Sequence, residues 1–157
     1  MLFRSWRLDR VRAAGIGECL DALAVSDVAE AIRDLTGGRG AEVTVDATGR
    51  PEVWELAIAS VARGGCVLFF GGCAPGSTIT VDTRRAHYEE LALIGAFHHT
   101  PETISRAVEL LETEALVPDA LLTHTMGLRE VPEALALMAR GEGLKILIDP
   151  RSSKEAG

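Results

Sequence analysis

The sequence predicts an α/β fold built on a parallel β-sheet with helices packed against it. Two patterns alternate along its middle: helical stripes with apolar residues three and four apart, and short continuous apolar runs typical of strands buried on both faces. Three of the apolar runs end at glycine. This alternation is typical of β-α-β units, in which a helix connects two parallel strands.

Length and composition agree with a globular α/β chain. Its 157 residues, 47% hydrophobic and 25% charged, make one ordinary domain or a piece of a larger protein. The formal charge of -7 gives no general attraction to nucleic acid or to anionic membrane surfaces. No apolar run reaches the roughly 18 residues of a spanning helix, and residues 1–7 lack the continuous apolar core of a secretory signal. We therefore expect a cytoplasmic protein with no nucleic-acid or membrane partner.

The first predicted helix follows Asp27. Asp27 can cap it with Glu30 three residues later, and the glycine pair at 37–38 supplies a left-handed stop. The next apolar run, residues 41–47, predicts a strand. The stripe of the helix consists of Val28, Ala31, Ile32 and Leu35.

A second helix and strand follow the turn at residues 48–49. Pro51 opens the helix, and the glycine pair at 64–65 is expected to end it. Residues 66–70 then form a second buried strand closed by two more glycines. The inner face of the helix is predicted to be Val53, Trp54, Ala57, Ile58 and Val61.

A third strand is predicted at residues 91–96, after a short strand or extended piece at 79–81. The three strands end at 48–49, 71–72 and 95–96, which in a parallel sheet lie at one edge. Ligands of open α/β sheets bind at this carboxyl edge. Glycines also simply end strands, but the set of three favours a cofactor-binding rim.

The last part of the chain changes character. Thr100 and Pro101 start a helix, and an edge strand at 121–125, a helix at 130–140 and a closing strand at 144–148 follow. The stripe of the first helix is Ile104, Ala107, Val108 and Leu111, and that of the second, expected to face inward, is Val131, Ala134, Leu135 and Met138.

Common short motifs fail by a residue or by context. Residues 15–20 supply only two glycines of G-x-G-x-x-G and follow a helix-like segment, whereas the motif follows a strand. Residues 71–77 have the spacing of a phosphate loop, with Ser77 where lysine is required. The histidine pair at 98–99 points to opposite faces and favours a surface or polar-pocket position over a metal site. Asp46, at a strand end, either holds a ribose hydroxyl or satisfies nearby backbone donors.

The three cysteines, Cys19, Cys66 and Cys73, form no C-x-x-C pair, so buried or incidental thiols are expected.

Residues 7–149 resemble the C-terminal half of a zinc-type medium-chain alcohol dehydrogenase of the sorbitol and threonine dehydrogenase branch. The resemblance rests on the order and spacing of DLTGGRGAEV (34–43), VDATG (45–49), GGCVLFFGG (64–72), LTH (122–124) and GEGLKI (141–146). It implies a partial doubly wound, Rossmann-like sheet within an incomplete dinucleotide-binding domain at 1–99. Residues 100–150 would be helices and strands returning to a missing catalytic domain, and 151–157 a flexible tail.

The resemblance also implies NAD or NADP as cofactor. The first strand end would approach its adenosine half, the next two would offer backbone groups to its nicotinamide end, and one lysine would neutralise the pyrophosphate. These residues are, in that order, Ala47, Thr48, Gly49 and Arg50; Phe70, Gly71 and Gly72 with Ala96, Phe97 and His98; and Lys145.

The sequence also departs from the family pattern. The zinc ligands, the first nucleotide-binding strand and its glycine loop have no counterpart, so no catalytic residue or metal ligand is named. A strand expected near Cys19 and Leu20 would lose its neighbour, and strand 43–47 would keep an open edge. An unpaired apolar edge invites another chain, so we expect a homo-oligomer formed through sheet edges.

Two functions follow as hypotheses. The first is a fragment of a zinc- and NAD(P)-dependent oxidoreductase that transfers a hydride between an alcohol or polyol and nicotinamide, inactive as the isolated chain. The alternative is a non-catalytic remnant serving as a self-association or weak nucleotide-binding module. A zinc-independent quinone reductase branch also stays open, because neither residues 36–40 nor the region of His124 and Glu130 distinguishes the branches.

Overall fold

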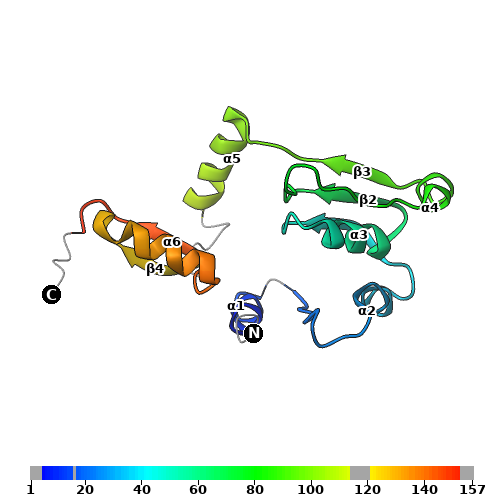
Figure 1. The fold of residues 1–157 in the computed structure, drawn as a ribbon, viewed down its shortest axis with the longest axis horizontal. Helices are drawn as coiled ribbons and strands as arrows, with labels where there is room; N and C mark the ends of the chain where they lie inside the picture. The colour runs from blue at the N-terminus through cyan, green and yellow to red at the C-terminus, as the bar shows by residue number, and fades with distance from the viewer. Residues whose placement is uncertain (1–4, 16, 114–120, 153–157) are drawn as a thin grey trace. The chain divides into compact units, whose positions relative to one another are not determined.

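The computed structural model describes residues 5–15, 17–113 and 121–152 (Figure 1). The chain forms two compact units, residues 22–99 and residues 1–21 together with 100–157. One border between the units lies at 99/100 and the other at 21/22. The division into a dinucleotide-binding domain at 1–99 and a returning segment at 100–150 stays a prediction.

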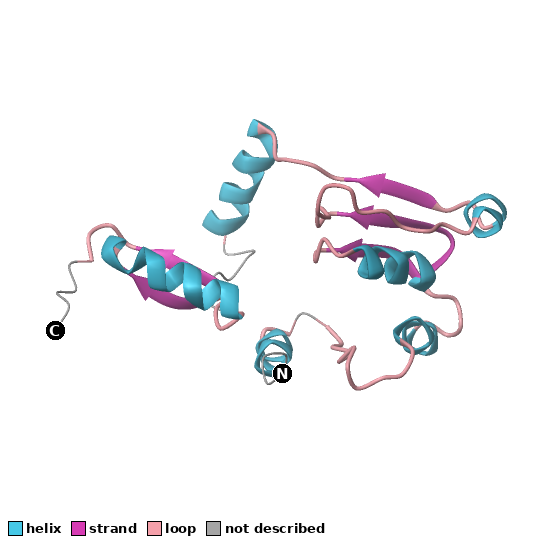
Figure 2. Ribbon diagram, in the orientation of Figure 1, coloured by secondary structure: helices cyan, strands magenta, loops and turns pink. Residues whose placement is uncertain are grey.

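The unit of residues 22–99 contains a three-stranded parallel sheet in the order β1-β2-β3 (Figure 2). The strands are β1 (Ala41–Asp46), β2 (Val61–Phe69) and β3 (Ala92–Gly95). Their last residues are in register, since Asp46 pairs with Phe69 and Phe69 with Gly95. The predicted α/β parallel sheet is confirmed, and its three carboxyl ends lie side by side.

Three helices accompany this sheet: α2 (Val28–Leu35), α3 (Pro51–Ser60) and α4 (Thr83–Tyr88). The predicted cap of α2 is confirmed, because the Asp27 side chain accepts a hydrogen bond of 2.9 Å from the Glu30 N–H. Helix α3 packs on β1 and β2, with Trp54 stacked on Phe69 at 4.0 Å between ring centroids. The core of the unit is Ala57, Ile58, Val61, Val67 and Phe69, with Trp54, Ile79, Val81 and Leu91 packed against it.

Strand β2 begins five residues earlier than predicted. Between the pairs Ala41–Val61 and Val43–Cys66, β1 advances by two residues and β2 by five, so the glycine pair at 64–65 lies in a bulge and does not end α3. Val61 is buried in the core, which favours the extended conformation at this point. A Cβ on Gly65 would come within 2.8 Å of the Glu42 carbonyl oxygen, so the bulge requires glycine there.

Two further elements differ from expectation. Helix α4 was not predicted, although Asp82 caps it by accepting from the N–H groups of Arg84 and Arg85. Residues 17–22 contain no strand, so the one expected near Cys19 and Leu20 is absent. The segment 79–81 is extended without joining the sheet.

The other unit contains α1 (Ser5–Ala13), α5 (Pro101–Glu112), β4 (Leu122–Met126), the 3-10 turn η2 (Leu128–Glu130), α6 (Val131–Arg140) and β5 (Lys145–Ile148). Strands β4 and β5 pair in parallel around α6. The Arg7 side chain of α1 donates to the carbonyls of Gly141 and Gly143 at 3.0 and 3.1 Å, which ties α1 to the end of α6.

The apolar faces of α5 and α6 are only partly covered. Leu135 and Met138, expected to face inward, are exposed, as are Ile104 and Val108 on α5. The stripes are present as predicted, but their burial is not, because periodicity fixes a face and not what covers it. Within the described part of the chain, no helix has the length and apolarity needed to cross a membrane.

Candidate functional site

The three carboxyl ends of the sheet are tied to one another by backbone hydrogen bonds. The N–H groups of Phe70 and Gly71 donate to the Asp46 carbonyl at 3.0 and 2.8 Å, and the Ala96 N–H donates to the Phe69 carbonyl at 3.2 Å. The loops after β1, β2 and β3 therefore meet at one edge, as the positions of the strand ends predicted.

Asp46 organises the first two loops. Its side chain is 2% exposed; Oδ1 accepts from the N–H and hydroxyl of Thr48 at 3.1 and 2.7 Å, and Oδ2 accepts from the Gly49 N–H at 2.9 Å and the Trp54 Nε1–H at 3.0 Å. Burial acts to raise the pKa of this carboxyl, but these hydrogen bonds outweigh it and hold the pKa below its ordinary value. Of the two roles left open for Asp46, the geometry supports the satisfaction of local donors.

Trp54 has a bonding role that the sequence did not reveal. Its indole N–H lies 3.0 Å from both Asp46 Oδ2 and the Gly71 carbonyl oxygen, so it bridges the loops after β1 and β2. The helical stripe identified Trp54 only as an apolar residue of the inner face. The general need of a buried indole N–H for an acceptor is the signal that could have found it.

Two glycines allow the first two loops to touch. Gly49 has a φ of +68°, and a Cβ built on it would lie 2.3 Å from the Gly72 carbonyl oxygen. A Cβ on Gly71 would lie 2.3 Å from the Gly49 nitrogen. Backbone atoms fill the space between these loops, so both glycines act in packing at this point.

The open space at this edge lies beside the third loop. A hollow of about 280 Å³ is lined by Phe70, Ala96, Phe97, His98 and His99. Phe70 is 65% exposed and Phe97 is 89% exposed, although both are large apolar side chains. His98 has a left-handed φ of +64°, which is uncommon for a residue with a side chain and occurs frequently at ligand sites. Exposed aromatic rings beside a hollow are typical of a ligand-binding surface.

Only some of the expected backbone donors remain available to a ligand. The N–H groups of Phe70, Gly71 and Ala96 are occupied within the chain, as given above. Those of Gly72, Phe97 and His98 form no hydrogen bond with other described residues. Two of these free donors, those of Phe97 and His98, belong to residues that line the hollow, whereas Gly72 does not line it.

The loop after β1 is exposed on both sides of Gly49. Ala47, Thr48 and Arg50 are at the surface, and Arg50 forms an ion pair with Glu52. Hydrogen bonds from the backbone N–H of Glu52 and from Arg50 lower the pKa of the Glu52 carboxyl. Arg50 is thus a cation at the edge of the site with an exposed, exchangeable partner.

Cys73 lies next to this edge but does not suit nucleophilic chemistry. Burial and the negative charges of Asp46 and Glu52 raise the pKa of its thiol. A thiol with a raised pKa is a weak nucleophile at neutral pH.

Lys145 and the strand-end loops belong to different compact units. Lys145 is the exposed first residue of β5 in the other compact unit, and its part in a dinucleotide site stays a prediction. Among the described residues, no three His, Cys, Asp or Glu side chains are grouped so as to hold a metal ion. These residues therefore do not fit a zinc site, and no chemical step is derived through zinc.

Comparison with known proteins assigns the family. A family model described as zinc-binding dehydrogenase matches residues 4–113. The chain belongs to the zinc-binding dehydrogenase family.

Three relatives illustrate the likeness of this zinc-binding dehydrogenase family member. It is 38% identical over 90 residues to D-altritol 5-dehydrogenase of Agrobacterium fabrum, covering 57% of this chain and 26% of that protein. It is 32% identical over 130 residues to erythritol/L-threitol dehydrogenase of Mycolicibacterium smegmatis, covering 82% and 35%. A solved zinc-binding dehydrogenase from Sinorhizobium meliloti bound to NADP superposes with a TM-score of 0.82 at 24% identity, covering 94% of this chain and 43% of that one. This last likeness shows the fold alone.

The chain spans about a third or less of the length of the two curated relatives named. The activity of such whole proteins is therefore a matter for proposal here.

Proposed function

We propose that the carboxyl edge of β1-β2-β3 binds NAD or NADP, and that the chain is the cofactor-binding part of an oxidoreductase acting on an alcohol or polyol. The observation that carries the proposal is the open hollow lined by Phe70 and Phe97, placed where parallel strands end. The family assignment and the polyol dehydrogenases among the relatives support it.

The residues of the hollow suit the nicotinamide end of such a cofactor. The rings of Phe70 and Phe97 offer an apolar surface that displaces water from a planar ring. The free N–H groups of Phe97 and His98, which line the hollow, are donors suited to a carboxamide oxygen. When bound, nicotinamide supplies the hydride acceptor or donor, and the protein supplies position and a dry surface.

Two cations, Arg50 and Lys145, are assigned to the rest of the cofactor. Arg50 stands at the exposed end of the loop after β1, where it can exchange Glu52 for a phosphate oxygen. Lys145 would act on the pyrophosphate as a point charge. Neither assignment is needed for the binding test below.

Binding is tested by titrating the purified chain with NADH and NADPH, using cofactor fluorescence and calorimetry. We expect a Kd in the micromolar range for at least one of them. Phe97→Ala should weaken it about threefold to tenfold, because an aromatic contact contributes about 0.5–1.5 kcal/mol. Tyr88→Ala is the matched control, since Tyr88 is also an exposed aromatic residue of this unit but lies at the end of α4. Absence of binding at millimolar cofactor, or equal affinity of the Phe97→Ala and wild-type chains, would contradict the proposal.

We further propose that the isolated chain does not turn over substrate. The described residues offer neither a metal-ligating group nor a general base at the hollow, apart from histidines on an exposed loop. Assays with polyols, NAD or NADP and added zinc should give no rate above background. Zinc-dependent turnover that survives removal of contaminating enzymes would refute this.

A second candidate function, self-association through the sheet edge, rests on β1. Val43 is 59% exposed and Val45 is 56% exposed, and no other described strand pairs with the outer edge of β1. Val43 and Val45 also line a hollow of about 350 Å³ with Ile32, Val53 and Leu56. An apolar edge of this kind accepts a further strand.

Light scattering over a range of concentrations tests this second candidate. We expect dimers or larger species, and Val45→Lys should shift the chain toward monomer because a charge at an edge opposes pairing. Ser77→Lys is the matched control, because it adds the same single charge at an exposed position of this unit whose side chain forms no hydrogen bond with other described residues. A monomeric wild-type chain would exclude the self-association module.

A further inference from the structure

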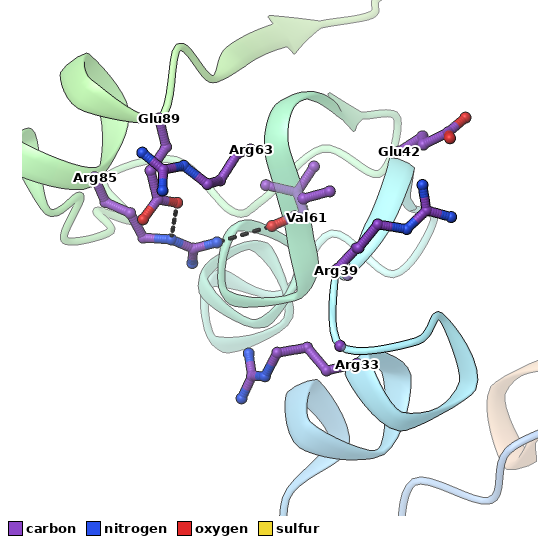
Figure 3. Close-up of a pocket in the computed structure, with 10 residues that line it drawn as sticks. Arg33, Arg39, Glu42, Val61, Arg63, Arg85 and Glu89 are labelled. Atoms are coloured by element: carbon purple, nitrogen blue, oxygen red, sulfur yellow. Dashed lines mark hydrogen bonds and ion pairs between the residues drawn. The ribbon is translucent and has the colours of Figure 1, made fainter.

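A second pocket lies at the opposite end of the sheet, around the amino ends of β1 and β2 (Figure 3). Its volume is about 750 Å³, and it belongs entirely to the unit of residues 22–99. Four arginines line it in a chain whose formal charge is -7, together with two glutamates. These charged residues are Arg33 on α2, Arg39 before β1, Arg63 in β2 and Arg85 on α4, with Glu42 and Glu89.

Two of the arginines are held in place by the end of α3. Arg85 donates to the carbonyls of Ile58 and Val61, both at 2.8 Å, and to Glu89 at 2.8 Å. Arg33 donates to the Ala59 carbonyl at 3.3 Å and to Glu30 through two nitrogens. These bonds satisfy carbonyls left open at a helix end. Each guanidinium has five N–H groups, so the bonds given leave each arginine with two more to donate.

Arg63 differs from this pair. Its side chain is exposed, and it forms no hydrogen bond or ion pair with other described residues. Glu89 pairs with Arg85 and Glu30 pairs with Arg33, whereas Arg63 has no ion pair with a described residue. The capping of α3 therefore accounts for the positions of the Arg33 and Arg85 side chains, but it does not account for an arginine at position 63.

The side chains are arranged on two sides of Val61. Figure 3 shows Arg63 and Arg85 beside Glu89, Arg33 apart from them beyond the end of α3, and Arg39 with Glu42 on the other side of Val61. Arg63, Arg85 and Arg33 come from three different elements, so their free N–H groups approach from different directions. Donors that reach a ligand from different directions match the tetrahedral oxygens of phosphate. A planar carboxylate needs only one arginine fork.

We propose that this pocket binds a phosphate group, either free or carried by a small organic ester. Arg63 makes the principal contact, while Arg33 and Arg85, already fixed by their carbonyl bonds, add donors at little cost in side-chain entropy. The pocket is larger than one phosphate ion needs, and Glu42 on its other side is an acceptor for ester hydroxyl groups. The site is at the opposite sheet end from the candidate cofactor site and does not depend on it.

The test is a titration of the whole chain with inorganic phosphate and, separately, with ribose 5-phosphate. Calorimetry gives the affinity, and NMR signals of the arginine Nε–H groups report the site. We expect saturable binding and a shifted Arg63 signal. Arg63→Gln should weaken binding about tenfold or more, the loss typical of a charged hydrogen bond. Tighter binding of the ester identifies an organic phosphate as the source, whereas equal binding identifies free phosphate.

Arg84→Gln is the matched control, because Arg84 is an exposed arginine on the same helix as Arg85 but does not line the pocket. It should bind as the wild-type chain does, and both variants should keep the wild-type Tm because both side chains are exposed. Lack of saturation at 10 mM phosphate or ester, equal losses in the two variants, or competition by NADH would each overturn the proposal.

Discussion

Replacement of Asp46 by asparagine tests the hydrogen-bond centre of the strand-end loops. The carboxylate serves four donors, two on each oxygen. Asparagine turns one oxygen into an NH₂ group, which must then face either the pair from Thr48 or the pair from Gly49 and Trp54. The Thr48 hydroxyl can rotate to accept, so the smaller loss leaves the partly buried Thr48 N–H unpaired and removes the charge. Charged hydrogen bonds contribute about 1.5–3 kcal/mol each, so Asp46→Asn should lower the free energy of unfolding by about 2–4 kcal/mol.

Urea unfolding followed by circular dichroism measures the loss. Asp34→Asn is the matched control, because Asp34 is an exposed residue of α2 whose side chain forms no hydrogen bond with other described residues. It should change the stability by less than about 0.5 kcal/mol. Equal stabilities of the two variants would refute the role given to Asp46.

The pH dependence of the same loss has a defined sign. The pKa of Asp46 is lower in the folded chain than its ordinary value of 3.8. A lowered pKa means that the stabilisation is fully present above about pH 4 and disappears as the pH falls through the folded-state value. The difference between wild type and Asp46→Asn should therefore be constant from pH 5 to 7 and shrink below about pH 4. A difference that grows toward acid pH would contradict the lowered pKa.

Two pairs of substitutions test the packing around these loops and in the other unit. Gly49→Ala should destabilise the chain by about 2 kcal/mol or more, because alanine disfavours a positive φ and its Cβ would clash with the Gly72 carbonyl. Gly76→Ala, also at positive φ but facing open space, should cost about 1 kcal/mol. Arg7→Ala should lower the stability of the unit containing α6 by about 1–3 kcal/mol by removing its two carbonyl contacts. Arg106→Ala, which removes only an exposed ion pair on α5, should change the Tm little. Thermal melts that rank each pair in the opposite order would contradict the assignments.

The sheet could be predicted because its strands are local patterns. Three apolar runs end at glycine, and apolar runs of this length are typical of parallel strands. The expected burial on both faces was wrong for β1 and β3, because Val43, Val45 and all four residues of β3 are exposed. The start of β2 was missed for a physical reason: a glycine pair predicts a helix stop, but here it forms a bulge inside a strand. Local sequence does not distinguish the two, since the outcome depends on Val61 entering the core.

Helix α4 and the hydrogen bonds of Trp54 could not be predicted from local sequence patterns. The six residues of α4 carry no apolar stripe, and what positions it is Arg85, which reaches the end of α3. Trp54 was correctly expected on an inner face, but the acceptors of its N–H come from two strands. Contacts between elements far apart in sequence decide both cases.

The arginine pocket shows the same limit. Its arginines are separated along the chain and follow no motif, and they meet only because α2, β2 and α4 converge at the amino ends of the strands. Composition gave the opposite expectation, since a chain of charge -7 repels anions on average. A local site of one sign can exist within an opposite net charge, because fields at short range are set by the nearest groups.

The hydrogen bonds of the strand-end loops also separate stability from cofactor binding. Asp46, Trp54 and Gly49 close the first two loops on themselves, and both Asp46 oxygens already accept two hydrogen bonds each. The exposed Phe97, in contrast, contributes little to the core. If the carboxyl edge binds a dinucleotide, Asp46→Asn should reduce stability and affinity together, whereas Phe97→Ala should reduce affinity at unchanged Tm. Loss of affinity in Phe97→Ala only in proportion to a fall in Tm would show that the hollow is part of the folding core and not a ligand surface.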